Sequence, residues 1–193
     1  MERISEITRT TRETDITIRL DLDGRGKTDI DTGVPFFDHM LDAFGRHGLF
    51  DLTVHARGDV DVEAHHTVED CGIVLGQCFA QALGDCRGIV RYGSPMDEAL
   101  VMAAVDISGR GQLHYDVEMT CPLLGSFDVT LAQEFFIALA TNMGATLNIR
   151  SVTGRNMHHI LEAAFKAAAR AISAAVAIDP RIADEVPSTK GVL

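Results

Sequence analysis

HHTVEDCGIVLGQCFAQAL at residues 65–83 decides the fold prediction, because its opening motif occurs a second time in the chain. HHTVE (65–69) and HHILE (158–162) share the pattern His-His-x-x-Glu, and each begins a run with apolar residues at helical spacing. The two copies are offset by 158 − 65 = 93 residues. Two other anchors recur at an offset of 85: GRG (24–26) as GRG (109–111), and Glu13 as Glu98. The sequence therefore predicts an internal duplication, with a longer loop around residues 120–126 in the second copy.

Working outward from these anchors, hydrophobic periodicity predicts the same element order in both halves. The first half is expected to hold strands at 2–12, 15–22 and 49–56 and helices at 34–47 and 67–83. The second is expected to hold strands at 98–106 and 145–151 and helices at 129–140 and 157–176. We expect an α+β fold, a two-layer α/β sandwich in which a small strand-rich unit is duplicated and mixed sheets carry helices on one face. No Pro/Ser-rich linker separates the halves, so residues 1–193 are expected to form a single compact domain of two pseudo-repeats, about 1–87 and 88–193.

Composition narrows the possible partners. The 193 residues carry a formal net charge of −11, which argues against a nucleic-acid binder or a polybasic membrane binder. The four cysteines form no C-x-x-C pair, and the sequence MERISE at the start has no apolar signal core. These features predict a cytoplasmic protein with reduced thiols that binds neither nucleic acid nor membranes.

Four of the eight histidines lie in the two His-His-x-x-Glu motifs, which predicts metal binding. In each motif the histidines and the glutamate are three and four residues apart, which places them on one face of a helix. Imidazole and carboxylate without thiolate suit Mn, Fe, Zn or Co. The alternative interpretation is a pair of polar helix starts at a solvated edge.

Helix geometry constrains how these ligands can be shared. Adjacent helical residues point about 100° apart, so neighbouring histidines such as His65 and His66 do not easily bind the same ion. Two motifs then suggest two metal sites, each with ligands from both motifs or from different subunits. His39, in FFDHM (36–40), offers a further imidazole, and Glu134 is its counterpart in the second half. Arg91, Arg110 and the tail PSTKG (187–191) could hold an anion within this acidic chain.

Several segments together resemble imidazoleglycerol-phosphate dehydratase of histidine biosynthesis. They are FFDHMLDAFGRHGLFDL (36–52), HHTVED (65–70), RYGSPMDEAL (91–100), VDISGRG (105–111), HHILEAAFKAAARA (158–171) and VPSTKGVL (186–193). The resemblance runs nearly end to end. It implies a metal-dependent hydro-lyase that removes water from D-erythro-imidazoleglycerol phosphate to give imidazole acetol phosphate. It also implies two Mn²⁺ ions per active site, at subunit interfaces of a 24-subunit shell.

Carried over motif by motif, the resemblance also implies the site residues. The implied metal ligands are His39, His65, His66, Glu69, Glu134, His158, His159 and Glu162. The implied substrate-binding residues are Glu13, His39, His47, His65, Arg91, Arg110, His158, Ser188 and Lys190. We nominate Glu13 as the proton-transferring group, with Glu162 or Asp106 as helpers.

Two other classes of protein use similar residues. A binuclear metallohydrolase acting on a phosphate ester would place the phosphate on its metals rather than on Arg and Lys. A non-catalytic, metal-stabilised shell protein would need the two His-His-x-x-Glu motifs but neither Arg91, Arg110 nor the hydroxyl and lysine of the tail.

Overall fold

The chain is described here by a computed structural model that covers residues 2–90, 99–188 and 190. The first half contains β1 (Ile4–Thr10), β2 (Thr14–Asp21), β3 (Thr28–Asp31), α1 (Pro35–Gly48), β4 (Asp51–Gly58) and α2 (His65–Leu83). The second half contains β5 (Val101–Ile107), β6 (Gln112–Asp116), β7 (Leu123–Leu124), β8 (Phe127–Asp128), α3 (Leu131–Met143), β9 (Ala145–Ser151) and α4 (Met157–Val176). None of the helices in these described ranges is both long and apolar enough to cross a membrane.

The strand order shows that the two halves share one topology. The first sheet has the order β1-β2-β4-β3 and the second has the order β5-β9-β6. In the first, β4 pairs antiparallel with β2 and parallel with β3; in the second, β9 pairs antiparallel with β5 and parallel with β6. This correspondence confirms the predicted duplication. Within the described residues, the first sheet also contains β1, and the second half also contains the β7–β8 hairpin, in the predicted longer loop.

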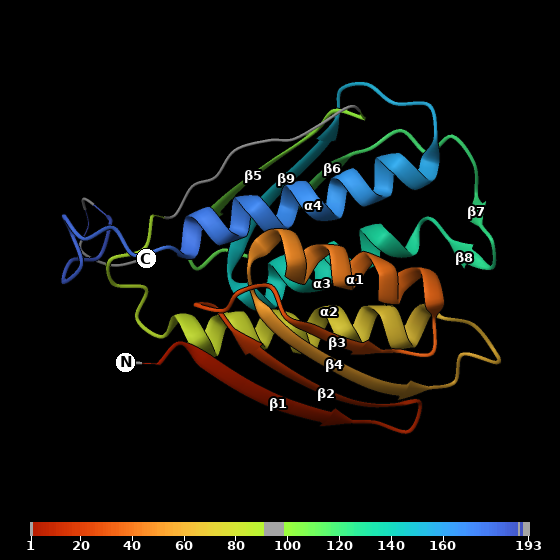
Figure 1. Cartoon of the computed structure of the whole chain (residues 1–193), viewed down its shortest axis with the longest axis horizontal. Coiled ribbons are helices and arrows are strands. Elements are labelled where there is room, and N and C mark those ends of the chain that lie inside the picture. The colour runs from red at the N-terminus through yellow and green to blue at the C-terminus, as the bar shows by residue number, and fades with distance from the viewer. Residues whose placement is uncertain (1, 91–98, 189, 191–193) are drawn as a thin grey trace.

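The helices lie between the two sheets (Figure 1). Helices α1 and α2 pack on one face of the first sheet, and α3 and α4 on one face of the second. Between the halves, α2 packs against α3 and α1 against α4. Each half is thus a mixed sheet with helices on one face, as predicted, and the two halves meet through their helix layers.

Alternation along the strands explains why one face of each sheet is covered. In β2, residues Ile16, Ile18 and Leu20 are fully buried while the residues between them face outward. The buried aromatic rings continue across the duplication: Phe135 of α3 lies 5.2 Å from Phe165 of α4 and 5.6 Å from Phe37 of α1, between ring centroids. One apolar core is therefore built from both halves.

Two glycines set the close contact between α2 and α3. A Cβ at Gly72 would lie 2.7 Å from the carbonyl oxygen of Phe135, and a Cβ at Gly76 would lie 2.8 Å from that of Leu139. The contacted residue of α3 advances from Phe135 to Leu139 as the glycine of α2 advances from Gly72 to Gly76, so the two helices run parallel. Their N-terminal turns therefore lie at one end of the molecule and their C-terminal ends at the other.

Element boundaries differ modestly from those expected. Helix α2 begins at His65 and not at residue 67, so the histidines are part of its first turn. The short strands β3 and β6 were not predicted, because four or five residues give little periodic signal. In the strand expected at 98–106, Glu98 lies outside the described residues and β5 begins at Val101.

Candidate active site

Three predicted ligands meet where α1 packs against α4. His39 comes from α1, and His158 and Glu162 come from the first turns of α4. One ligand atom from each of the three lies within 4.8 Å of the others. The Nε2 atoms of His39 and His158 are 3.6 Å and 3.3 Å from a carboxylate oxygen of Glu162. The side chain of Asn156 caps α4 by accepting a hydrogen bond from the His158 backbone N–H at 3.0 Å, which fixes where this turn begins.

The charge of this cluster suits a divalent cation. The pKa of Glu162 is lowered, first by the ammonium of Lys166 that donates to it and also by the nearby imidazoles of His39 and His158. Its carboxylate is therefore ionised at neutral pH. Two imidazoles and one carboxylate that converge without a thiolate fit a borderline divalent ion such as Mn, Fe, Zn or Co.

A second set of ligands follows from the duplication. On α2, Nε2 of His65 lies 3.5 Å from a carboxylate oxygen of Glu69, as His158 lies beside Glu162 on α4. Glu134, in the first turn of α3, corresponds to His39, because their offset of 134 − 39 = 95 equals that of the left-handed helix ends Leu49 and Gly144, 144 − 49 = 95. The first turn of α3 lies at the same end as that of α2, since these helices run parallel. His65, Glu69 and Glu134 are therefore the counterparts of His158, Glu162 and His39. Among the described residues, however, only His39, His158 and Glu162 bring three ligand atoms within 4.8 Å of one another.

Adjacent histidines point in different directions. The ring planes of His65 and His66 are 88° apart with centroids separated by 6.0 Å, and those of His158 and His159 are 89° and 6.0 Å apart. His66 turns toward Asp59, whose carboxylate lies 2.9 Å from its Nδ1 and raises its pKa. Because Asp59 engages Nδ1, Nε2 is the nitrogen that His66 could offer to a metal. The predicted divergence of neighbouring histidines is confirmed in both motifs.

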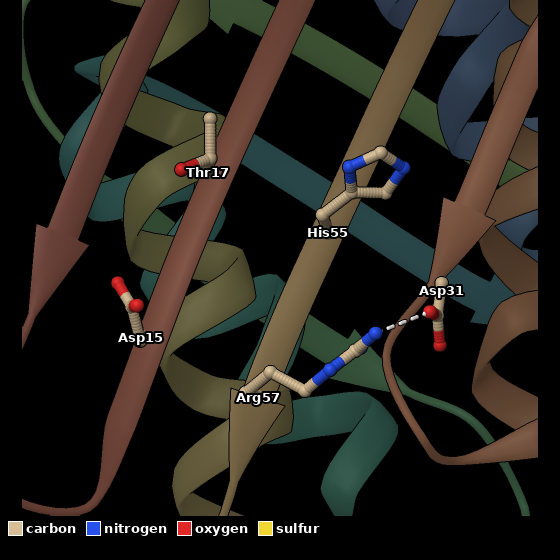
Figure 2. A pocket seen from close by; sticks show the side chains of 5 residues that line it. All are labelled: Asp15, Thr17, Asp31, His55 and Arg57. Carbon is tan, nitrogen blue, oxygen red and sulfur yellow. Dashed lines mark hydrogen bonds and ion pairs between the residues drawn. The ribbon is translucent and has the colours of Figure 1, made fainter.

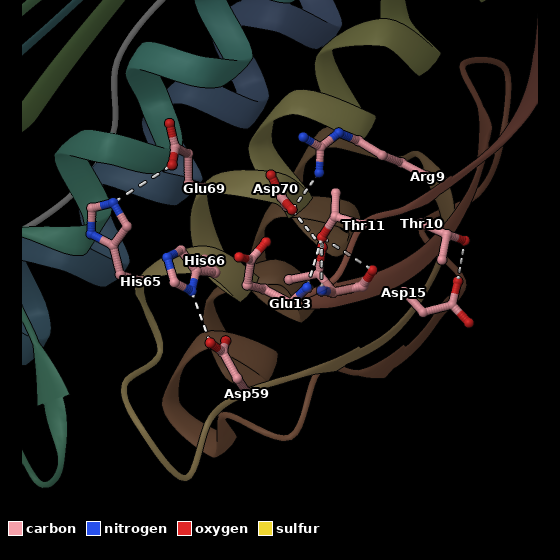
Figure 3. A network of polar contacts seen from close by, with 11 residues as sticks. Arg9, Thr10, Thr11, Glu13, Asp15, Asp59, His65, His66, Glu69 and Asp70 are labelled. Carbon is pink, nitrogen blue, oxygen red and sulfur yellow. Dashed lines mark hydrogen bonds and ion pairs between the residues drawn. The ribbon is translucent and has the colours of Figure 1, made fainter.

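Glu13 lies in the turn between β1 and β2, beside His66 (Figure 3). Its negative charge, after that of Asp59, contributes to the raised pKa of His66. The structure thus brings the nominated proton-transfer group next to a proposed metal ligand, although 53 residues of sequence separate the two (66 − 13 = 53).

The predicted anion-binding residues that the structure describes, Arg110 and the tail, lie at the other end of α2 and α3. A cavity of about 370 Å³ there is lined by Leu83 at the end of α2, Met143 at the end of α3, Gly109 and Val186 of the tail. Arg110 follows Gly109, and its carbonyl accepts a hydrogen bond from Thr146 at 3.3 Å. In the tail, the Lys190 N–H donates to the Ser188 hydroxyl at 3.2 Å. Asp106 lies in β5 on the same side, and Arg91 lies outside the described residues.

The two ends of the molecule are too far apart for one small substrate. From His65 to Leu83, α2 covers 83 − 65 = 18 residues, and at 1.5 Å per residue this is about 27 Å. The phosphate of a three-carbon chain cannot reach the second end while its other end lies at the first. Within one chain, the metal motifs and the Arg110–tail region therefore do not form a common site.

Two residues near the metal cluster were missed by the sequence analysis. Lys166 pairs with Glu162, and helical spacing of four residues was a signal that could have identified it. Asp59 gave no such signal, because it contacts His66 only through the loop before α2.

His47, predicted to bind substrate, lies in the last turn of α1. Its pKa is lowered by burial and then by the charges of Lys166 and Arg170.

Another pocket, on the outer face of the first sheet, contains none of the predicted residues. It encloses about 290 Å³ and is lined by Asp15, Thr17, Asp31, His55 and Arg57 (Figure 2). Its arginine is paired with Asp31 at 2.7 Å, and His55 lies 3.3 Å from Asp29. These exposed ion pairs belong to the solvated surface of the sheet, and the converging ligands on the helices remain the better candidate for chemistry.

The proteins that this chain resembles in sequence and in structure are described as imidazoleglycerol-phosphate dehydratases. A family model described as imidazoleglycerol-phosphate dehydratase matches residues 32–172. The imidazoleglycerol-phosphate dehydratases of Acidiphilium cryptum and Symbiobacterium thermophilum are 59% and 56% identical to the chain; both alignments cover 100% of it, and 100% and 93% of the two relatives. The crystal structure of the Staphylococcus aureus imidazoleglycerol-phosphate dehydratase superposes with a TM-score of 0.81 at 38% identity, over 91% of this chain and 99% of that one. IGPD from Pyrococcus furiosus gives a TM-score of 0.82 at 37% identity, over 97% and 100%.

Proposed function

Because the chain belongs to the imidazoleglycerol-phosphate dehydratase family, we propose that its helix-borne imidazoles and carboxylates hold two Mn²⁺ ions in each active site. The chain is a hydro-lyase of histidine biosynthesis that converts imidazoleglycerol phosphate to imidazole acetol phosphate. The observation that carries the metal proposal is the convergence of His39, His158 and Glu162 within 4.8 Å. The proposed ligands are His39, His65, His66, Glu69, Glu134, His158, His159 and Glu162.

The reaction requires a proton to leave a carbon that is only weakly acidic. When bound, manganese supplies Lewis-acid polarisation of the substrate's imidazole and hydroxyl. Glu13 takes up or delivers the proton, since its carboxylate lies beside His66 and is not needed as a ligand. Glu162 and Asp106 are the proposed helpers in proton transfer.

The substrate's phosphate is proposed to bind Arg91, Arg110, Ser188 and Lys190, with His47 in the same binding region. The distance of about 27 Å between the two ends of α2 supports a site in which these groups come from a different copy of the chain than the metal ligands. Such a shared site requires a homo-oligomer, and a shell of 24 subunits is the proposed assembly.

We further propose a single domain of two pseudo-repeats, about 1–87 and 88–193, which is supported by the apolar core common to both halves. The proposed location of the protein is cytoplasmic.

The metal assignment is tested by removal and replacement. Purified protein is stripped with a chelator and mixed with imidazoleglycerol phosphate, and the ultraviolet absorbance of the enolised product is followed. Turnover should be lost on stripping and restored by Mn²⁺ more fully than by Mg²⁺ or Zn²⁺ at equal occupancy. Full turnover by the stripped protein, or restoration by Mg²⁺ alone, would contradict the manganese proposal, and release of inorganic phosphate would favour a metallohydrolase.

A further inference from the structure

Asp70 follows Glu69 on α2 and lies one helical turn after His66, where it contacts β1 and the start of β2. The residue is buried, with 8% of its surface exposed. One of its carboxylate oxygens accepts hydrogen bonds from the guanidinium of Arg9 on β1 and from the hydroxyl of Thr14 at the start of β2 (Figure 3). Asp70 therefore ties both strands that flank Glu13 to the helix that carries Glu69.

The turn that carries Glu13 is closed by its own hydrogen bonds. The hydroxyl of Thr11 accepts from the N–H of Glu13 at 3.1 Å and from the N–H of Thr14 at 2.9 Å. The N–H of Thr11 donates to the Thr14 carbonyl at 2.8 Å. Since the Thr14 hydroxyl donates to Asp70, the turn is attached directly to α2. The exposed Glu13 side chain thus takes its place beside His66 from the backbone of this turn.

The duplication shows that this connection is separate from the metal motif. The counterpart of Asp70 in the second half is Ala163, at the motif offset of 93 (70 + 93 = 163), which has no carboxylate. The second motif therefore places its ligands without this ion pair. Desolvation offsets much of the attraction in a buried ion pair, so Arg9–Asp70 is a poor source of stability but a good source of defined geometry.

We propose that Asp70 is a positioning residue for catalysis: with Arg9 and Thr14 it fixes the Glu13 turn against α2, so that the Glu13 carboxylate has a defined position relative to the metal ligands. This inference rests on the proposed role of Glu13. A displacement of about 1 Å at a reacting group can cost on the order of 100-fold in rate. The effect of Asp70 must pass through Glu13, which makes it separable from a general effect on folding.

The test is a double-mutant cycle on the metal-loaded, assembled enzyme. Asp70→Asn preserves the size of the side chain but removes the charge that pairs with Arg9. It should lower kcat by about 10- to 100-fold, with KM and bound metal unchanged. In a Glu13→Gln background the same substitution should lower kcat less than about twofold, because the group being positioned no longer transfers a proton.

Further variants keep the test decisive if Asp70→Asn assembles poorly. Thr14→Val removes the hydroxyl at similar volume and should lower kcat, whereas Thr14→Ser retains the donor and should restore it. Asp31→Asn breaks the exposed ion pair with Arg57 on the same sheet and is the matched control, with kcat near that of the parent. Hydrogen exchange of the amides at 11–14 should accelerate in Asp70→Asn and Thr14→Val and remain slow in Asp31→Asn.

Proton transfer by Glu13 and positioning by Asp70 are contradicted by different results. If Glu13→Gln alone has parental turnover, Glu13 is not the proton-transfer group, and the proposed role fails together with the inference. If Glu13→Gln is impaired but Asp70→Asn lowers kcat equally in both backgrounds, only the positioning role is overturned. Loss of metal in proportion to activity, or unchanged exchange at 11–14, overturns it as well.

Discussion

Histidines and carboxylates at this site differ in their contacts, and these contacts suit them to different proposed roles. His158 lies beside Glu162 and His39, whereas His66 turns to Asp59 and has a raised pKa. Among the carboxylates, Glu162 is paired with Lys166, whereas the Glu13 side chain is exposed in its turn. The contacts of each side chain, and not its type, determine whether it binds a metal, orients a ligand or is available to move a proton.

Substitution of Glu13 separates proton transfer from metal binding. Glu13→Gln preserves size and hydrogen bonding but cannot cycle a proton. We expect normal assembly, full metal content and a loss of turnover of about 100- to 10,000-fold. Metal analysis, particle size and turnover are measured on one preparation. If metal is lost together with activity, Glu13 supports the metal site instead, and Asp106 becomes the next candidate.

Substitution of Lys190 tests the proposed role of the tail. Phosphate is remote from the reacting carbons, so its contacts contribute to binding more than to the chemical step. Lys190→Ala should therefore raise KM by a larger factor than it lowers kcat, as measured by steady-state kinetics. A large fall in kcat at unchanged KM would argue against phosphate binding by this lysine.

At the scale of elements, two close approaches shape the molecule. The GRG turn at 24–26 is held by Asp51 at the start of β4, whose carboxylate accepts hydrogen bonds from the N–H groups of Arg25 at 2.7 Å and Lys27 at 2.9 Å. In the core, Gly72 and Gly76 allow α2 to approach the backbone of α3. The first contact joins the turn between β2 and β3 to β4, and the second sets the distance between α2 and α3.

The Asp51 contact predicts a pH-dependent contribution to stability. The pKa of Asp51 is lowered by the N–H of Lys27 and then by that of Arg25, so its stabilisation is present above the ordinary aspartate pKa and is lost as pH falls through the folded-state value. For this exposed carboxylate, Asp51→Asn should cost about 0.5–1 kcal/mol at pH 7. Urea unfolding of both metal-free proteins should show this difference shrinking between pH 5 and pH 3. A difference that is constant with pH would assign the effect to packing.

The close approach at Gly76 predicts that one methyl group added between α2 and α3 lowers the stability of the fold. In Gly76→Ala, the new Cβ would lie 2.8 Å from the Leu139 carbonyl oxygen and 2.9 Å from Cβ of Asn142. Separating the helices should cost about 1–3 kcal/mol, more than the gain in helix propensity of about 1 kcal/mol. Gln81→Ala, at an exposed position of the same helix, is the control and should be neutral or slightly stabilising. Urea denaturation compares the two, and a stabilised Gly76→Ala would show that the helices can separate at no cost.

At the scale of the whole molecule, the proposed ligands of the first motif and the Arg110–tail region lie at opposite ends of α2. This arrangement favours active sites shared between copies of the chain. Ligands at an interface link metal binding to association, so removal of metal should also release subunits.

Chelation therefore should reduce the size of the particle as well as stop turnover. Light scattering before and after treatment with a chelator measures the mass, and metal analysis verifies removal. Restoring Mn²⁺ should recover the larger particle, which serves as the control for irreversible damage. A particle of unchanged mass with its metal shown to be gone would contradict ligation at the interface.

The sequence by itself determined the duplication, the order of the helices and longer strands, and the residues of the two His-His-x-x-Glu motifs. These features are local or repeated: His-His-x-x-Glu spacing defines one helical face, and the recurrence of this motif and of GRG sets the correspondence of the halves. The divergence of adjacent histidines also followed from helix geometry alone, and the ring planes 88° and 89° apart agree with it.

Only the tertiary structure decided which residues meet. His39 joins His158 (158 − 39 = 119 residues away) and Glu162 (162 − 39 = 123 residues away) because α1 packs against α4 of the other half. No local pattern encodes that pairing. Likewise, Asp59 contacts His66 from the loop before α2, and Asp70 contacts Arg9 of β1 and Thr14 at the start of β2. Spacing along a chain determines the face of an element, whereas contacts between elements depend on how all the buried faces pack together.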